Sequence, residues 1–220
     1  AAFYAKQNGK NRIQVYEGNI DAERRNKETG YEQVAPTVYA LVAAIDAKDS
    51  FTFQHSTNVS QYAVLLAQKL GLPGDDIHTV KVAGLLHDIG KIGIPESILK
   101  KAGKLTNEEY EIMKSHVQKS IEMIHYLPNM NYVIPAVVSH HERYDGKGYP
   151  RGLKGEGIPF LGRILAVCDS FDAMISKRAY KEALSVEYAM GELEKNKGTQ
   201  FDPKVADAFI ELIKEGKVPL

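Results

Sequence analysis

The stretch VSQYAVLLAQKLG, residues 59–71, decides the fold class of this chain. Its apolar residues recur at the three-and-four spacing of one buried helix face, and they are Val59, Tyr62, Ala63, Leu66, Ala67 and Leu70. Gly71 follows the last of them, as glycine often does where a helix ends. The stretch therefore predicts an amphipathic helix that packs against a core.

Similar patterns and helix-start signals continue outward in both directions. Thr106 and Glu109 have the spacing of a capping box, and Asp202 followed by Pro203 is typical of an N-cap and a first helical turn. We expect helices over residues 31–48, 54–70, 75–89, 107–125, 130–141, 159–175, 185–195 and 202–215. Only residues 11–17 have the pattern of a strand. The predicted fold is all-α, a bundle of about seven to eight helices with a short N-terminal segment outside the core.

Composition limits the class of protein. The chain has 220 residues, of which 44% are hydrophobic and 25% charged, which is enough for a sizeable core. No apolar run approaches the roughly 18 residues that span a bilayer, and the single cysteine, Cys168, suits a reducing compartment, so we expect a cytoplasmic protein without a membrane span. A net charge of zero argues against general nucleic-acid binding. Because the chain begins without methionine, we expect a fragment of a longer protein.

Histidines and buried carboxylates are the candidate functional residues. Five of the seven histidines lie on predicted helices that are apolar on one face, and they are His55, His87, His116, His140 and His141. One such histidine is most often a satisfied core residue, but five together weaken that interpretation. Asp88 follows one apolar run and Asp169 another, and a buried carboxylate requires a compensating cation.

These side chains together predict a metal site. Two carboxylates and five imidazoles are too many ligands for one tetrahedral zinc ion and about right for two octahedral ions that share a bridging ligand. The mixed donors favour iron, manganese, zinc or nickel over calcium or magnesium, and ligand type alone does not choose among the four. We therefore expect two divalent ions per chain.

Several motifs, in their order along the chain, resemble the HD-GYP family of the HD superfamily, which are bacterial metallophosphodiesterases. The motifs are FTFQHS (51–56), HDIGKIGIP (87–95), SHVQKS (115–120), HHERYDGKGYP (140–150), RILAVCDSFDAMISKRAYK (163–181) and GTQFDP (198–203). The resemblance covers residues 46 to about 206 and implies an HD-domain helical bundle, placed here over residues 31–220. It also implies hydrolysis of cyclic di-GMP to the linear dinucleotide pGpG, and in some members onward to GMP, by a hydroxide that bridges the metals.

The resemblance assigns the metal ligands residue by residue. One ion would be held by His55, His87, Asp88 and Asp169, and the other by Asp88, His116, His140 and His141, with Asp88 as the bridge. Within the family's range of metals we expect iron or manganese, with zinc and nickel as alternatives. Some relatives carry a glutamate at the position of Phe51, where it recruits a third ion, and a phenyl ring supplies no ligand. We therefore expect two ions rather than three.

Catalytic and substrate contacts are assigned in the same way. Asp88 and Lys91 are the implied catalytic residues, and Lys91, Tyr149, Arg178 and Lys181 are the implied substrate contacts. From residue 143 to residue 181 there are eight Lys or Arg and four Asp or Glu, a local surplus that suits a dianionic dinucleotide. The alternatives are a loop-anchoring role for Tyr149 and a solvated charged face for the basic residues. On an unbroken helix Arg178 would face away from Asp169, so we expect a break near Ser176.

The loop over residues 142–150 is expected to lie beside the metal ligands. Gly146 and Gly148 permit a close approach of the backbone to a ligand. Glu142, Arg143 and Asp145 are expected to brace this loop rather than to contact the ligand.

The N-terminal residues have a separate resemblance. AAFYAKQNGKNRIQVYE, residues 1–17, resembles the C-terminal end of a GGDEF domain, so we expect residues 1–30 to be a GGDEF remnant with a linker and the full-length chain to contain a GGDEF domain. Two other functions stay open, namely hydrolysis of cyclic GMP-AMP and a weakly active sensor or docking module that binds GGDEF partners. Homodimerisation also stays open.

Overall fold

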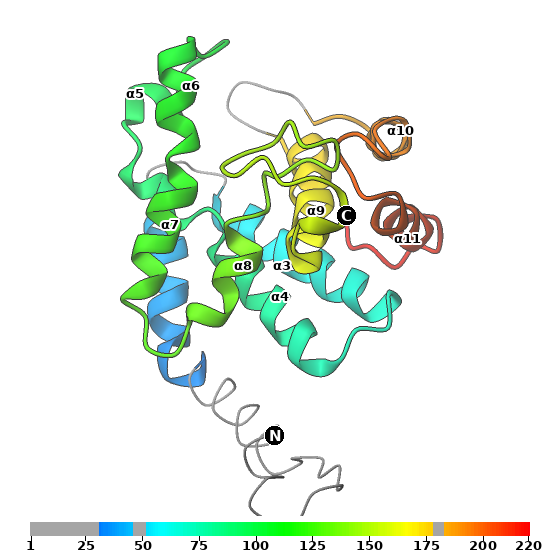
Figure 1. Cartoon of the computed structure of the whole chain (residues 1–220), viewed down its shortest axis with the longest axis horizontal. Coiled ribbons are helices and arrows are strands. Elements are labelled where there is room, and N and C mark those ends of the chain that lie inside the picture. The colour runs from blue at the N-terminus through cyan, green and yellow to red at the C-terminus, as the bar shows by residue number, and fades with distance from the viewer. Residues whose placement is uncertain (1–30, 46–51, 178–182) are drawn as a thin grey trace, which may run out of the picture.

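The computed structural model describes residues 31–45, 52–177 and 183–220 of the chain (Figure 1). Within these ranges the chain is helical, and the one β-type pairing is an isolated bridge between Lys197 and Phe201. The predicted all-α class is therefore confirmed. The predicted strand over 11–17, the GGDEF-like residues 1–30, and the positions Phe51, Arg178 and Lys181 lie outside the described residues.

The helices follow one another as short, separate elements. Residues 31–45 form the first described helix. The elements after it are α3 (Thr52–Lys69), α4 (Gly74–Leu86), η1 (Ile89–Gly93), α5 (Glu96–Leu99), α6 (Asn107–Lys114), α7 (His116–His125), η2 (Asn131–Val133), α8 (Ile134–Val137), η3 (Gly155–Gly157), α9 (Phe160–Ile175), α10 (Val186–Lys195) and α11 (Pro203–Lys214).

The centre of the bundle is α3, which packs against both α4 and α9 (Figure 1). Tyr62 of α3, Phe171 of α9 and Phe209 of α11 are each buried, and their rings meet with centroids 5.1–6.0 Å apart. Aromatic pairs at this separation contribute beyond their buried area. The apolar face predicted from residues 59–71 is therefore the face that joins three helices into one core.

The predicted helix starts and one predicted break are confirmed. The Thr106 hydroxyl accepts a hydrogen bond from the Glu109 N–H at 3.2 Å, and the Glu109 carboxylate accepts one from the Thr106 N–H at 2.7 Å. Asp202 caps α11, and Pro203 is its first residue. Ser176 has an extended backbone with φ −84° and ψ 133°, so α9 ends at Ile175, as predicted.

Three predicted helices were too long. The helix expected over 75–89 ends at Leu86, the one over 107–125 is divided at Ser115, and the one over 130–141 is replaced by η2 and by α8, which ends at Val137. Beyond each end lies a histidine whose Nδ1 hydrogen-bonds to a carbonyl of the last helical turn, described below. Carbonyls of a last helical turn lack the N–H partner four residues later that they would have inside a helix.

The turn that carries His87 and Asp88 is pressed against α7. A Cβ atom at Gly90 would lie 2.0 Å from the carbonyl oxygen of His116, so only glycine fits there. The Ser120 hydroxyl accepts from the Gly90 N–H at 2.8 Å and donates to the His87 carbonyl at 3.0 Å. These contacts set the distance between Asp88 and the start of α7.

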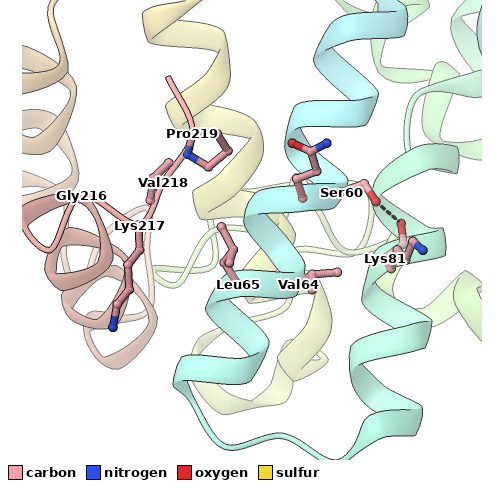
Figure 2. A pocket seen from close by; sticks show the side chains of 9 residues that line it. Ser60, Val64, Leu65, Lys81, Gly216, Lys217, Val218 and Pro219 are labelled. Carbon is pink, nitrogen blue, oxygen red and sulfur yellow. Dashed lines mark hydrogen bonds between the residues drawn. The ribbon is translucent and has the colours of Figure 1, made fainter.

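The C-terminal tail returns over the other side of α3. The Tyr62 hydroxyl donates to the Pro219 carbonyl at 3.0 Å, and Val218 is buried. Between the tail, α3 and α4 lies a groove of about 630 Å³, which we call the tail groove; its lining is Ser60, Gln61, Val64, Leu65, Lys81, Gly216, Lys217, Val218 and Pro219 (Figure 2). Over the described residues, no helix combines the length and the apolar character that crossing a bilayer needs.

Candidate metal centre

The structure brings the seven predicted ligands together from five separate elements. His55 comes from α3 and Asp169 from α9, His116 is the first residue of α7, and the others follow α4 and α8. The side chains form two groups, and within each group the potential ligand atoms lie within 4.8 Å of one another. The first group is Asp88, His116, His140 and His141, and the second is His55, His87 and Asp88. Asp88 belongs to both groups. Contrary to the prediction, His87, His140 and His141 lie outside helices, whereas His55 lies within α3 and His116 begins α7.

Three of the histidines are oriented by the same kind of hydrogen bond. In each, the ring Nδ1 lies at hydrogen-bonding distance from the main-chain carbonyl three residues earlier, at the end of a helix. The pairs are His87 with Gly84 at 2.7 Å, His116 with Met113 at 2.6 Å and His140 with Val137 at 2.5 Å. A carbonyl only accepts, so Nδ1 carries the proton and Nε2 keeps its lone pair. Metal-ligating histidines are oriented in this way.

The opposite ring nitrogens of these histidines lie close together near Asp88 and have no hydrogen-bond partners. The Nε2 atoms of His55, His87, His116 and His140 and the Oδ1 atom of Asp88 are buried and unpartnered. His116 Nε2 lies 3.3 Å from Asp88 Oδ1, and His87 Nε2 lies 3.4 Å from Asp88 Oδ2. Buried acceptors that face one another are costly unless a cation lies among them. Imidazole and carboxylate are donors for transition metals, so these residues fit a metal centre.

Asp169 and His55 form the second edge of the centre. His55 Nε2 lies 3.1 Å from Asp169 Oδ1, while His55 Nδ1 lies 2.7 Å from a carboxylate oxygen of Asp172. Burial alone would lower the pKa of His55, but the carboxylates of Asp169 and Asp172 beside its ring raise the pKa to about 9.

Asp172 was not predicted as a site residue. It is fully buried, and besides His55 it accepts hydrogen bonds from the side chains of Asn58 at 2.8 Å and Ser176 at 3.0 Å. Its position three residues after Asp169, on the same face of an apolar helix, was the available signal. Asp172 holds the His55 ring in place rather than facing the centre.

Burial keeps the other imidazoles neutral. It lowers the pKa of His116 and of His140 to about 4, and it also lowers the pKa values of His87 and His141. Neutral imidazole is the form that binds a metal. These four rings are therefore ready to act as ligands at neutral pH.

The carboxylates remain charged despite their burial. Burial would raise the pKa of Asp88, but the Lys91 ammonium beside it holds that pKa well below its usual value. Burial would likewise raise the pKa of Asp169, but the His55 ring beside it holds that pKa well below its usual value. Lys91 Nζ lies 2.5 Å from Asp88 Oδ2, and 17% of the Lys91 side chain is exposed. The predicted catalytic lysine therefore lies beside the carboxylate common to both groups.

The loop over residues 142–150 forms one side of a pocket next to the metal centre, and we call this pocket the centre pocket. It measures about 290 Å³ and is lined by Tyr110, His140, His141, Glu142, Arg143, Lys147, Gly148, Tyr149, Ala166, Ser170 and Gln200. A Cβ atom at Gly148 would lie 2.3 Å from the Arg143 nitrogen, so the loop closes tightly only with glycine there. The Tyr149 ring stacks on the His141 ring, with centroids 4.8 Å apart.

The expected bracing of this loop is present. The Glu142 carboxylate accepts hydrogen bonds from the backbone N–H groups of Arg151 at 2.8 Å and Leu153 at 2.9 Å. Arg143 donates to Asp145 at 3.0 Å and to Gln200 at 3.1 Å. The charged side chains after His141 therefore hold the loop in shape, and Tyr149 remains on its pocket side.

Comparison with known protein families agrees with this arrangement. The family described as HD domain matches residues 40–205, a range that contains all seven clustered ligands. The chain belongs to the HD domain family.

Two curated relatives extend the likeness beyond this HD domain. The cyclic di-GMP phosphodiesterase response regulator RpfG of Xanthomonas campestris is 41% identical over 181 residues, which cover 81% of this chain and 48% of the relative. The 3′3′-cGAMP-specific phosphodiesterase 2 of Vibrio cholerae is 39% identical over 208 residues, which cover 90% of this chain and 39% of the relative. The chain thus spans half or less of the length of these relatives.

A solved structure shares the fold of the HD domain. It is a cyclic GMP-AMP specific phosphodiesterase of Vibrio cholerae, with a TM-score of 0.65 and 18% identity, over 82% of this chain and 49% of that one. At this identity the likeness concerns the fold. The helical arrangement that gathers the histidines is therefore found in more than one chain of divergent sequence.

Proposed function

We propose that this HD domain is a metal-dependent phosphodiesterase that hydrolyses cyclic di-GMP to pGpG, with onward hydrolysis to GMP as a second step. The observation that carries the proposal is the convergence of five buried histidine and aspartate side-chain atoms without hydrogen-bond partners at Asp88. A relative that is 41% identical is named a cyclic di-GMP phosphodiesterase, which supports the choice of substrate.

The proposed cofactors are two divalent ions, iron or manganese, with zinc and nickel as alternatives. His55, His87, Asp88 and Asp169 would hold one, and Asp88, His116, His140 and His141 the other. Ions held there supply an activated hydroxide near neutral pH and neutralise the oxygens of the attacked phosphate. The proposed bridging role of Asp88 is supported by its membership of both ligand groups.

The remaining roles belong to side chains around the centre. Lys91, held 2.5 Å from Asp88, would offer its ammonium to the scissile phosphate. Tyr149 faces the centre pocket and would contact the substrate there. Arg178 and Lys181, which lie outside the described residues, are proposed as further phosphate contacts because they belong to the basic surplus between residues 143 and 181.

The proposal extends to the protein that contains this chain. We place the HD domain after a GGDEF domain, represented here by residues 1–30, because of the sequence resemblance of residues 1–17. The buried free cysteine, Cys168, suits the reducing cytoplasm in which we expect the enzyme to act. Whether two copies associate is a question for the full-length protein.

A second candidate substrate is cyclic GMP-AMP. The specific observation in its favour is the 39% identity to a relative named as 3′3′-cGAMP-specific, across 90% of this chain. Both candidate substrates are cyclic purine dinucleotides, and the same metal centre would serve either of them.

One experiment tests cofactor and substrate together. The chain is purified without oxygen, its metals are quantified, and the products from each cyclic dinucleotide are separated by chromatography. We expect two ions per chain and faster release of pGpG than of any product of cyclic GMP-AMP. Three fully occupied ions would contradict the count that follows from Phe51, and Phe51→Glu is expected to raise the count from two to three. Full metal content without hydrolysis of either dinucleotide would contradict the proposed activity.

A further inference from the structure

One wall of the centre pocket comes from α6, an element that supplies none of the metal ligands. The residue that reaches the pocket is Tyr110, and 47% of it is exposed, although tyrosine is a large and mainly apolar side chain. In Figure 1, α6 stands beside the main body of the bundle as a continuation of α7. Tyr110 thus presents an aromatic ring to the pocket from outside the metal centre.

The rings near Tyr110 are arranged as a corner. Tyr149 has one face stacked on His141, at 4.8 Å between centroids and 29° between planes. Tyr110 stands at 81° to Tyr149 with 6.3 Å between centroids. A planar aromatic ligand can therefore lie flat on one tyrosine while its edge meets the other, which is the offset or edge-to-face geometry that aromatic groups prefer.

A cation completes this corner. Lys114, one helical turn after Tyr110, places Nζ 5.3 Å from the Tyr110 ring centroid and 5.7 Å from that of Tyr149. Cation–π contacts at this distance hold rings and ammonium together. Lys114 also pairs with Glu111 at 2.6 Å. The corner thus combines exposed aromatic surface with positive charge, the two features that recognise a nucleotide.

We propose that Tyr110 is a stacking platform for a purine base of the substrate, so that α6 is part of the substrate-binding site. This inference rests on the proposed function, because it assumes that a cyclic purine dinucleotide enters the centre pocket. Stacking on an aromatic ring is tolerant of base identity. Tyr110 therefore contributes affinity for either purine dinucleotide and does not discriminate guanine from adenine.

The test compares substitutions at Tyr110 in the metal-loaded chain. For Tyr110→Ala we expect KM for cyclic di-GMP to rise by about 5-fold to 100-fold, which is the range for the loss of one base–aromatic stack. Tyr110→Phe keeps the ring and should retain most of the affinity, whereas Tyr110→Leu keeps apolar bulk and should behave like alanine. KM and kcat for a cyclic dinucleotide analogue that lacks both bases, and so has no aromatic ring to stack, should stay unchanged in all three variants.

The matched control is Tyr126→Ala, which removes an exposed tyrosine from the turn after α7. Tyr126 is 88% exposed and does not line the centre pocket, so its loss should leave both substrates unaffected. An unchanged KM for cyclic di-GMP in Tyr110→Ala, or equal losses on both substrates, would overturn the stacking role.

Binding of fluorescently labelled cyclic di-GMP separates this inference from the proposed function. If the chain binds the label without hydrolysing cyclic di-GMP, the proposed function fails, while a weaker affinity in Tyr110→Ala still supports stacking. If the chain binds no label at all, the inference is overturned as well.

Discussion

Among the described residues, the tail groove and the centre pocket differ in size and in chemistry, and the smaller of these two is the candidate site. The tail groove measures about 630 Å³ and the centre pocket about 290 Å³. In the tail groove the buried Ser60 hydroxyl donates to the Lys81 carbonyl at 2.8 Å (Figure 2). Beside the centre pocket, by contrast, buried acceptors have no hydrogen-bond partner.

The metal centre and the tail groove lie on different faces of a single helix, α3. His55 and Ser60 both belong to α3, and five residues separate them, which places them about 140° apart around the helix axis. The face with Ser60 is complete as it stands, because its polar group is satisfied within the protein. The face with His55 adjoins buried polar atoms without hydrogen-bond partners, and a cation bound among them would satisfy them. Buried polar atoms without hydrogen-bond partners, rather than the volume of the neighbouring pocket, therefore identify the functional face of α3.

The largest expected effect comes from Asp88→Asn. An amide of the same shape removes the one carboxylate common to both ligand groups. We expect turnover to be lost and metal content to fall, by more than the roughly 10-fold to 100-fold typical of residues that only orient ligands. Rates, elemental analysis and circular dichroism, which should show the helical fold intact, check this together. Normal metal content with a normal rate would show that Asp88 does not hold the ions.

A smaller effect is expected from Asp172→Asn, which leaves every facing ligand in place. The amide removes the charge that orients His55, and we expect metal affinity to fall by about 10-fold to 100-fold. Competition with a fluorescent chelator measures that affinity.

Ser60→Ala on the opposite face of α3 is the matched control for this prediction. Loss of its single hydrogen bond should lower the free energy of unfolding by about 1 kcal/mol and leave metal affinity unchanged. Equal losses of affinity in Asp172→Asn and Ser60→Ala would remove the distinction between the two faces.

Metal removal is expected to lower the stability of the folded chain. Ions present at about 100 times their dissociation constant stabilise a folded protein by about 2.7 kcal/mol. For a chain of this length that corresponds to about 5–10 °C in Tm. Thermal unfolding before and after chelation measures the shift, and Asp88→Asn should show much less of it. A Tm that is insensitive to chelation in the wild-type chain would mean that the buried acceptors are satisfied in another way.

The sequence correctly predicted the structural features that interactions between near neighbours in the chain determine. Thr106 with Glu109, and Asp202 with Pro203, mark helix starts by short-range hydrogen bonds and backbone geometry, and the structure has both. The seven side chains predicted as ligands lie together in the structure, and buried histidine and aspartate in apolar runs were the signal that singled them out. Asp172 was missed because its partner His55 lies 117 residues away in sequence.

The errors in helix length have one physical cause. Periodicity continued the helices through His87, His116 and His140, but in the structure each ring bonds to a carbonyl at the end of a helix. These bonds require that the helix stop, and apolar spacing carries no information about them. Local rules therefore failed at the residues that form the candidate site, where function competes with regular structure.

The carbonyl-anchored histidines also bear on any attempt to build such a centre in another protein. A designer who copied the seven side chains onto continuous helices would reproduce the composition and lose the orientation, because carbonyls inside a helix are occupied by its own N–H groups. The transferable unit is a helix terminus together with the imidazole that follows it. A design should therefore reproduce three helix ends, each followed by a histidine directed toward one aspartate, rather than the seven side chains alone.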